Sequence, residues 1–169
     1  MWKLRPLVNK IKANFMKHFV PEQNLSFDET MVKYYGQHSC KQFIRGNPIR
    51  LGYKMSLCIP DGYLKHFEVY QGKAPNANPL YEQHFEKCAA PLLTFIDEFT
   101  DEKKKMPYHF FFDNLFTSLN LLNYFRRQGY GATGTVRENH LQKCQKLTSN
   151  KMLKKKSIGY YESAISKEK

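Results

Sequence analysis

Two aspartates that each follow a strand-like apolar run are the residues of this sequence best suited to metal chemistry. Asp28 follows Asn24–Phe27, and Asp113 follows Tyr108–Phe112. A carboxylate that ends a buried strand is costly to leave unpaired, so two that face each other are best explained by a shared divalent cation. The pair therefore predicts half of a nuclease-type metal site.

Both aspartates also have an ordinary structural interpretation. Asp28 can pair with a nearby lysine or a backbone amide, and Asp113 can form an Asx turn or a helix entry with Asn114 and Thr117. The three phenylalanines before Asp113 favour a rigid strand, which is how an active-site carboxylate is held in place. Glu29 should point away from Asp28 because side chains alternate along a strand, so we expect it to be structural.

The elements that must position these side chains predict an α/β fold. Helical spacing, turn residues and apolar runs predict, in chain order, a helix over 4–19, strands over 24–35, 49–59 and 64–70, a helix over 80–99, a strand over 108–112, a helix from Thr117 or Ser118 to about Gln128, and a strand over 130–137. Pro91 should kink or divide the second helix. The order is that of a ribonuclease-H-like mixed sheet, a three-stranded meander followed by two crossover strands, behind an N-terminal helix.

Composition narrows the class of protein. The 169 residues, 41% of them hydrophobic and 15% aromatic, are sized for one domain with a substantial core. The apolar runs are too short for a membrane span, and no secretory signal is recognisable, so we expect no membrane partner. Cys40, Cys58, Cys88 and Cys144 are scattered without zinc spacing, which favours reduced thiols in the cytoplasm or nucleus.

The net charge of +12 is concentrated at the two ends of the chain. Basic ends suit a polyanion such as DNA, although a solvated surface or a disordered tail explains a charge run equally well. The candidate phosphate contacts are Arg137, Lys41, Lys54, Lys151, Lys154, Lys155 and Lys156. Such contacts predict affinity and salt dependence without sequence specificity. Lys154–Lys156 could also be part of a nuclear-localisation signal or solubilising charge.

An ordered set of short motifs extends this interpretation from the opening helix to about Asn139. The motifs are Leu25-Ser-Phe-Asp-Glu-Thr-Met31, Tyr35-Gly-Gln37, Gly52-Tyr-Lys-Met55, Gly62-Tyr63, Tyr70-Gln-Gly72, Phe112-Asp-Asn-Leu-Phe-Thr-Ser118 and Gly129-Tyr-Gly-Ala-Thr-Gly-Thr-Val-Arg-Glu-Asn139. Together they resemble the piggyBac transposases and the host proteins derived from them.

The resemblance implies a DDE/D-type transposase that cuts and joins DNA at TTAA sites. Asp28 and Asp113 match the first two catalytic carboxylates of that family, which would hold Mg²⁺ or alternatively Mn²⁺. The third carboxylate belongs to a downstream segment that this sequence does not contain. Since two metal ions need three carboxylates, we expect the chain alone to bind metal weakly and to be catalytically incomplete.

The same resemblance suggests a division of the chain. Residues 1–22 would be the stub of a helical DNA-binding or dimerisation region, 23–140 a partial ribonuclease-H-like domain truncated before its last core helix, and 141–169 a basic, poorly ordered tail. Without that helix an apolar patch should be exposed, which favours a homo-oligomer or association with the missing half of the domain.

Three functional hypotheses remain open at this point. The first is a nuclear transposase or transposase fragment, and the second is a domesticated, non-catalytic DNA- or chromatin-binding module. A degraded derivative without stable function is the third. None of them involves a small-molecule substrate.

Overall fold

A computed structural model describes residues 2–20, 22–59, 64, 66–70, 78–136, 147–148 and 150–165. These residues fall in two compact units, Met1–Thr135 and Val136–Lys169. The first unit contains every described strand and the helices η1 (Trp2–Leu4), α1 (Arg5–Lys17), α2 (Pro79–Asp97), α3 (Asp101–Lys104) and α4 (Leu119–Arg127). The second contains the short helix α5 (Asn150–Leu153).

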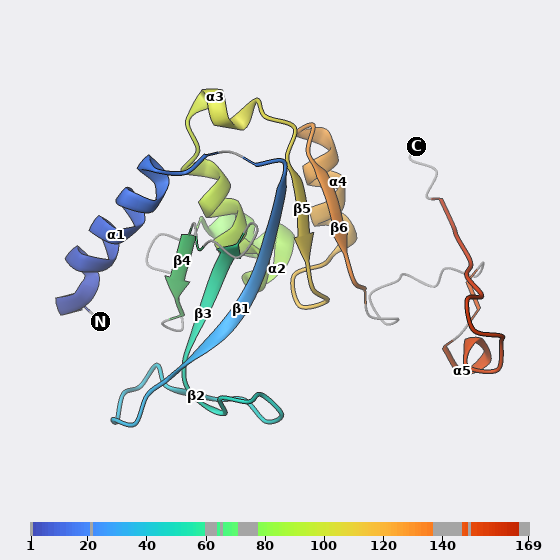
Figure 1. The fold of residues 1–169 in the computed structure, drawn as a ribbon, viewed down its shortest axis with the longest axis horizontal. Coiled ribbons are helices and arrows are strands. Elements are labelled where there is room, and N and C mark those ends of the chain that lie inside the picture. The colour runs from blue at the N-terminus through green and yellow to red at the C-terminus, as the bar shows by residue number, and fades with distance from the viewer. Residues whose placement is uncertain are drawn as a thin grey trace. The chain divides into compact units, whose positions relative to one another are not determined.

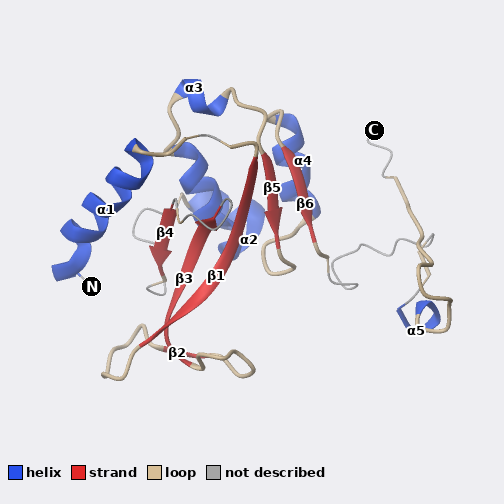
Figure 2. Cartoon of the chain, in the orientation of Figure 1, coloured by secondary structure: helices blue, strands red, loops and turns tan. Residues whose placement is uncertain are grey.

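The first unit is built on one mixed sheet, shown in Figures 1 and 2. Its strands are β1 (Asn24–Lys33), β2 (Gln42–Phe43), β3 (Leu51–Ile59), β4 (His66–Val69), β5 (His109–Phe112) and β6 (Gly131–Gly134). β1, β3 and β4 form an antiparallel meander, while β5 runs parallel to β1 and β6 runs parallel to β5. The sheet therefore has the predicted meander followed by two parallel strands.

Alternation of side chains gives each central strand a core face and an outer face. In β1, Leu25, Phe27 and Met31 are buried while Asp28 is exposed. In β5, Phe110 and Phe112 are buried and Phe111 lies on the outer face. This period of two is what a half-buried sheet requires, and it fixes the face on which each polar residue lies.

Helices α2 and α4 cover the core face of the sheet. Leu92, Leu93 and Phe95 of α2 and Leu121 and Phe125 of α4 join the buried strand residues in one hydrophobic cluster. The apolar residues of both helices recur at three- and four-residue spacing, so each helix presents one stripe to the sheet. The predicted helices over 80–99 and from Ser118 are thus confirmed as the core-forming ones.

Helix α2 extends from Pro79 to Asp97 with Pro91 inside it, at the position where the sequence predicted a kink or a division. A hydrogen bond between residues near its two ends shows that the helix is bent. The Tyr81 hydroxyl donates to Asp97 Oδ2 at 2.8 Å, although the two residues are 16 positions apart. A straight helix would separate them by about 24 Å, more than the two side chains can bridge. Proline is an ordinary cause of helix kinks, and Pro91 lies between the two residues that this hydrogen bond joins.

Capping residues set the ends of α4 as predicted. Ser118 Oγ accepts from Leu121 N at 3.2 Å, and Gly129 adopts a φ of 81°, where a side chain would be strained. β2, α3 and α5 have no counterpart among the elements predicted from the sequence. The connection between the predicted strands over 49–59 and 64–70, where Pro60, Asp61 and Gly62 predict a turn, lies outside the described residues.

Candidate functional site

The two aspartates lie on neighbouring strands in matching register. β1 and β5 pair in parallel, with Leu25 opposite Phe110 and Phe27 opposite Phe112. Asp28 and Asp113 are each the next residue along, so they share one level of the sheet. Parallel strands in register point equivalent side chains to the same face, and both aspartates are exposed on the face opposite the core.

Two details differ from the sequence-based expectation. Asp113 directly follows its strand, but Asp28 lies in the middle of β1, which continues to Lys33 because residues up to Lys33 still pair with β3. Both carboxylates are exposed to solvent. The supposed cost of burying them therefore does not apply, since each stays hydrated.

Backbone amides use one oxygen of each carboxylate. Glu29 N donates to Asp28 Oδ1 at 2.7 Å, and Leu115 N donates to Asp113 Oδ1 at 2.8 Å. The second contact is the Asx turn that the sequence left open as an alternative role for Asp113. Neither aspartate forms an ion pair with a described residue, so the second oxygen of each remains open to a cation.

The turn that carries Asp113 is held by a hydrogen bond within the turn and packs against Gly134 of β6. Thr117 Oγ1 donates to the Asp113 carbonyl at 2.6 Å, and Thr117 is itself buried. A Cβ at Gly134 would overlap Thr117 Oγ1 and lie 2.9 Å from the Phe112 ring. Because Gly134 has no side chain, Thr117 has space to form its hydrogen bond to the Asp113 carbonyl.

Gly134→Ala should consequently destabilise the first unit by about 1–3 kcal/mol through overpacking. In a Thr117→Ala background the same substitution should cost less, because one of the overlapping atoms is gone. Urea unfolding of the four variants measures this double-mutant cycle. Equal costs in the two backgrounds would show that Thr117 and Gly134 are not coupled.

Other side chains share the outer face with Asp113 and were not singled out from the sequence. His109 stacks on Phe111 with 4.6 Å between ring centroids, and its Nε2 lies 2.8 Å from Thr133 Oγ1 on β6. Counting back in steps of two from Asp113 identifies His109 and Phe111 as residues of the same face. The candidate site is thus bordered by an aromatic and imidazole surface on β5.

The oxygen donors of the pair suit a hard divalent cation. Mg²⁺ prefers carboxylate oxygens and keeps several waters, so one or two carboxylates are an ordinary protein contribution. Among the described residues, no group of three or more histidine, cysteine, aspartate or glutamate side chains is arranged to hold a metal. Asp28 and Asp113 therefore fit a cation as a partial ligand set.

The predicted DNA-contact residues belong to different parts of the chain. Lys54 on β3 forms an ion pair with Glu29, whose side chain lies on the core-facing side of β1 as its alternation with Asp28 requires. That pairing offsets the charge of Lys54. Lys151 in α5 and the exposed Lys154–Lys156 after it belong to the second unit. Arg137 lies outside the described residues.

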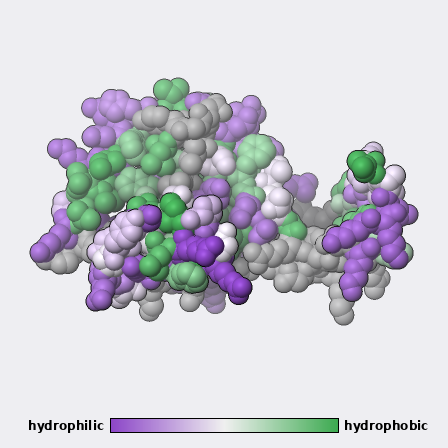
Figure 3. All heavy atoms as spheres, turned by 60° about the horizontal axis from the view of Figure 1, so that its bottom comes forward, coloured by the Kyte–Doolittle hydropathy of each residue, from purple (hydrophilic) through white to green (hydrophobic). Residues whose placement is uncertain are grey.

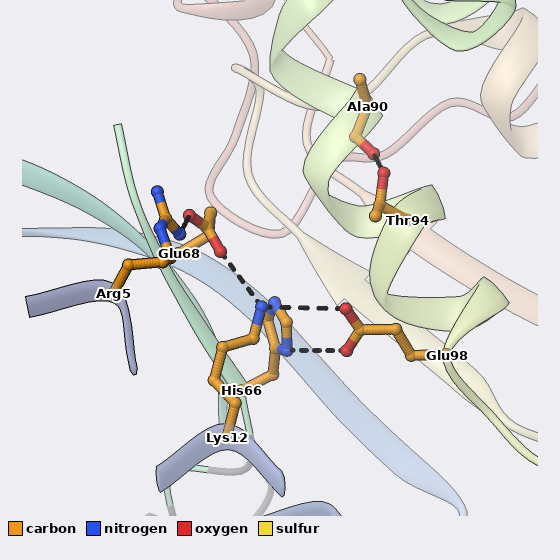
Figure 4. A network of polar contacts seen from close by, with 7 residues as sticks. All are labelled: Arg5, Lys12, His66, Glu68, Ala90, Thr94 and Glu98. Carbon is orange, nitrogen blue, oxygen red and sulfur yellow. Dashed lines mark hydrogen bonds and ion pairs between the residues drawn. The ribbon is translucent and has the colours of Figure 1, made fainter. Parts of the chain in front are cut away.

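A second polar cluster, shown in Figure 4, joins α1, β4 and the end of α2. Glu68 accepts from Arg5 at 2.9 Å and from Lys12 at 3.0 Å, and Lys12 lies 3.7 Å from Glu98. Burial, and then the positive charge of Lys12, lower the pKa of His66 to about 3. His66 is therefore neutral at pH 7, and its 3.6 Å approach to Glu98 is no ion pair there.

The described residues also bear on membrane-spanning helices and on the cysteines. No described helix is both long and apolar enough to cross a bilayer. Within the described residues, Cys40, Cys58 and Cys88 form no disulfide bond, and Cys144 lies outside those residues.

Comparison with known proteins gives consistent matches over nearly the whole chain. The family model described as "Transposase IS4" matches residues 1–167. The chain is 43% identical over 166 residues to the human "PiggyBac transposable element-derived protein 3" and 38% identical over 164 residues to the human "PiggyBac transposable element-derived protein 2". Each alignment covers 96% of this chain but only 27% of the relative, so the chain spans about a quarter of their length.

A solved structure supports the fold. The chain resembles the one described as "Cryo-EM structure of piggyBac transposase synaptic complex with hairpin DNA", with a TM-score of 0.64 and 21% identity. The match covers 94% of this chain and 30% of that one. At this identity the likeness concerns the arrangement of helices and strands.

Proposed function

We propose, from the premise that this chain belongs to the piggyBac-type family of transposases, that it supplies two catalytic carboxylates to a metal-dependent DNA-cleaving and DNA-joining protein. Asp28 and Asp113 are the proposed ligands, and TTAA-containing DNA is the substrate that the resemblance suggests. The observation that carries the proposal is the in-register placement of the two aspartates on one exposed face of β1 and β5.

The fold assignment that goes with this function is ribonuclease-H-like. The order β4–β3–β1–β5–β6, with an antiparallel meander and two parallel crossovers, supports it. In such a sheet the central strand and its parallel neighbour bring residues from distant parts of the sequence together. This arrangement is how the proposed site acquires two rigidly held carboxylates.

The residues of this chain would hold and orient the cation. When bound, Mg²⁺ or Mn²⁺ would supply Lewis-acid stabilisation of charge on the phosphate oxygens. Asp28 is held by Glu29 N and Asp113 by Leu115 N, so each carboxylate offers its remaining oxygen in a fixed direction. The Thr117 contact to the Asp113 carbonyl keeps that turn in place.

A non-catalytic DNA- or chromatin-binding module is the alternative function. It is favoured by the exposed lysines of the second unit, Lys151 and Lys154–Lys156, which need no metal to contact phosphates. We further propose a nuclear location for either function.

Metal binding at the pair is testable with the chain as it stands. Addition of Mn²⁺ should broaden the amide NMR signals of Phe27–Glu29 and Phe112–Asn114 first, because a paramagnetic ion acts on its nearest neighbours. Asp28→Asn or Asp113→Asn should remove this local broadening, whereas the control Asp101→Asn, an exposed acid on α3, should not. Broadening that is spread over all exposed acids and insensitive to the two variants would reject the site.

A further inference from the structure

The far end of the β1–β3 pair carries an exposed surface that the carboxylate site does not use. We call residues 33–51 the tip; they comprise the end of β1, a loop, β2, a second loop and the start of β3. Figure 1 shows β2 at this end of the sheet and α3 at the opposite end. In Figure 3, where this end comes forward, hydrophilic and hydrophobic residues are mixed on it.

The tip is basic without any compensating acid. It contains Lys33, Lys41, Arg45 and Arg50, and no aspartate or glutamate occurs between Glu29 and Asp61. Lys33, Arg45 and Arg50 are exposed and form no ion pair with a described residue. A surface of this kind favours a polyanionic partner over an ordinary protein surface, which would also present positive charges to be matched.

Exposed aromatic rings lie among these charges. Tyr35 is 81% exposed and Phe43 65% exposed, and Lys33 Nζ lies 5.1 Å from the Tyr35 ring centroid. An ammonium over one face of a ring leaves the other face accessible. Rings this exposed contribute nothing to the core, yet they are suited to stacking on the flat face of a nucleobase.

The base of the tip is held by its own contacts. Tyr34 packs on Tyr53 with ring centroids 4.8 Å apart, and His38 packs on the same ring at 5.6 Å. Lys41 Nζ donates to the Gly36 carbonyl at 3.0 Å, which fastens the first loop. Tyr35 and Phe43 are therefore presented from a braced loop and a paired strand.

We propose that the tip binds single-stranded DNA, with bases stacking on Tyr35 and Phe43 and with Lys33, Arg45 and Arg50 contacting phosphates. Stacking requires unpaired bases, which distinguishes this surface from one that contacts only the duplex backbone. The proposal deepens the proposed function. β1 continues for five residues beyond Asp28 to Lys33, so the strand places the start of the tip about 17 Å from the carboxylate pair.

Fluorescence anisotropy with a labelled oligothymidylate of about 12 nucleotides tests the proposal in EDTA, where no metal contributes. Tyr35→Ala should weaken binding by about 5- to 100-fold, while Tyr35→Phe should retain it. The matched control is Tyr161→Ala, since Tyr161 in the second unit is 85% exposed and should not matter. Arg45→Gln and Arg50→Gln should each reduce the log–log salt slope by about 0.7.

The assignment would be overturned by equal loss with Tyr161→Ala, by no loss with Tyr35→Ala, or by tighter binding of a blunt duplex of the same length that depends on Tyr35. Failure to bind any nucleic acid, with Tyr35-dependent capture of a protein instead, would also overturn it. Asp28→Asn should leave oligothymidylate binding unchanged. The experiments can therefore reject metal binding at Asp28 and Asp113 without rejecting DNA binding at the tip, and the reverse.

Discussion

Phe110→Ala is expected to destabilise the first unit by about 3–5 kcal/mol, a large part of the stability of a small domain. Phe110 has no exposed surface, stacks on Phe125 at 4.8 Å and meets Tyr130 edge-on at 5.7 Å. Removing the ring loses buried apolar area and leaves a cavity between β5 and α4. Urea or thermal unfolding followed by circular dichroism measures the change.

The neighbouring residue provides the control for this prediction. Phe111 lies on the same strand but on the outer face, where it is 40% exposed. Phe111→Ala should therefore cost about 1 kcal/mol or less. A similar loss for both variants would mean that β5 is buried on both faces, and the assignment of Asp113 to a solvent-exposed face would fail with it.

The second large effect concerns acid stability. The pKa of His66 is lowered to about 3 in the folded protein, mainly by burial, against an ordinary value of about 6.5 in the unfolded chain. Between these values the unfolded chain binds a proton that the folded protein does not bind. Stability should thus fall as the pH drops through this window, by up to about 1.4 kcal/mol per pH unit from this residue.

The groups that face His66 modify this slope. Glu98 lies beside the ring, and burial is the main reason that its pKa is raised, so its proton uptake on acidification favours the folded state and opposes the loss. The Lys12 ammonium disfavours a charged imidazole throughout.

His66→Phe should flatten the fall of stability between about pH 6.5 and 3 while keeping ring packing on Phe95, which lies 4.7 Å from His66. His84→Phe, at an exposed position of α2, is the control and should leave the slope as in the original protein. Urea unfolding at a series of pH values gives both slopes. The same slope in all three proteins would show that His66 does not carry the acid sensitivity.

The parts of the fold that could be predicted are those encoded locally. The apolar run before Asp113 identifies β5 as a strand, and Ser118 and Gly129 mark the ends of α4 by their capping chemistry. From the order of these elements the neighbouring positions of Asp28 and Asp113 could be anticipated. That both are exposed could not, because an apolar run alone does not say which side of a strand meets the core.

Other features depend on contacts between distant segments. β2 has only two residues, carries no periodicity and is defined by its pairing with β3. α3 is the exception, because its N-cap Thr100 is a local signal in a short charged stretch. The pairing of Lys54 with Glu29 follows from the register of β1 against β3, which turn chemistry does not determine. The polar cluster around His66 contains residues from α1, β4 and the end of α2, so no local sequence pattern predicts it.

The parallel pairing of β1 with β5 also has a consequence for folding kinetics. Phe27 meets Phe112 only after the chain has passed through β3, β4 and α2, whereas β1 and β3 are separated by one short excursion. Closing the longer loop costs more chain entropy, and contacts of high sequence separation slow folding. The antiparallel pair can form while β5 is still being synthesised. Asp28 and Asp113 can become neighbours only once β5 has been synthesised, so a nascent chain can form the tip before it can form the carboxylate pair.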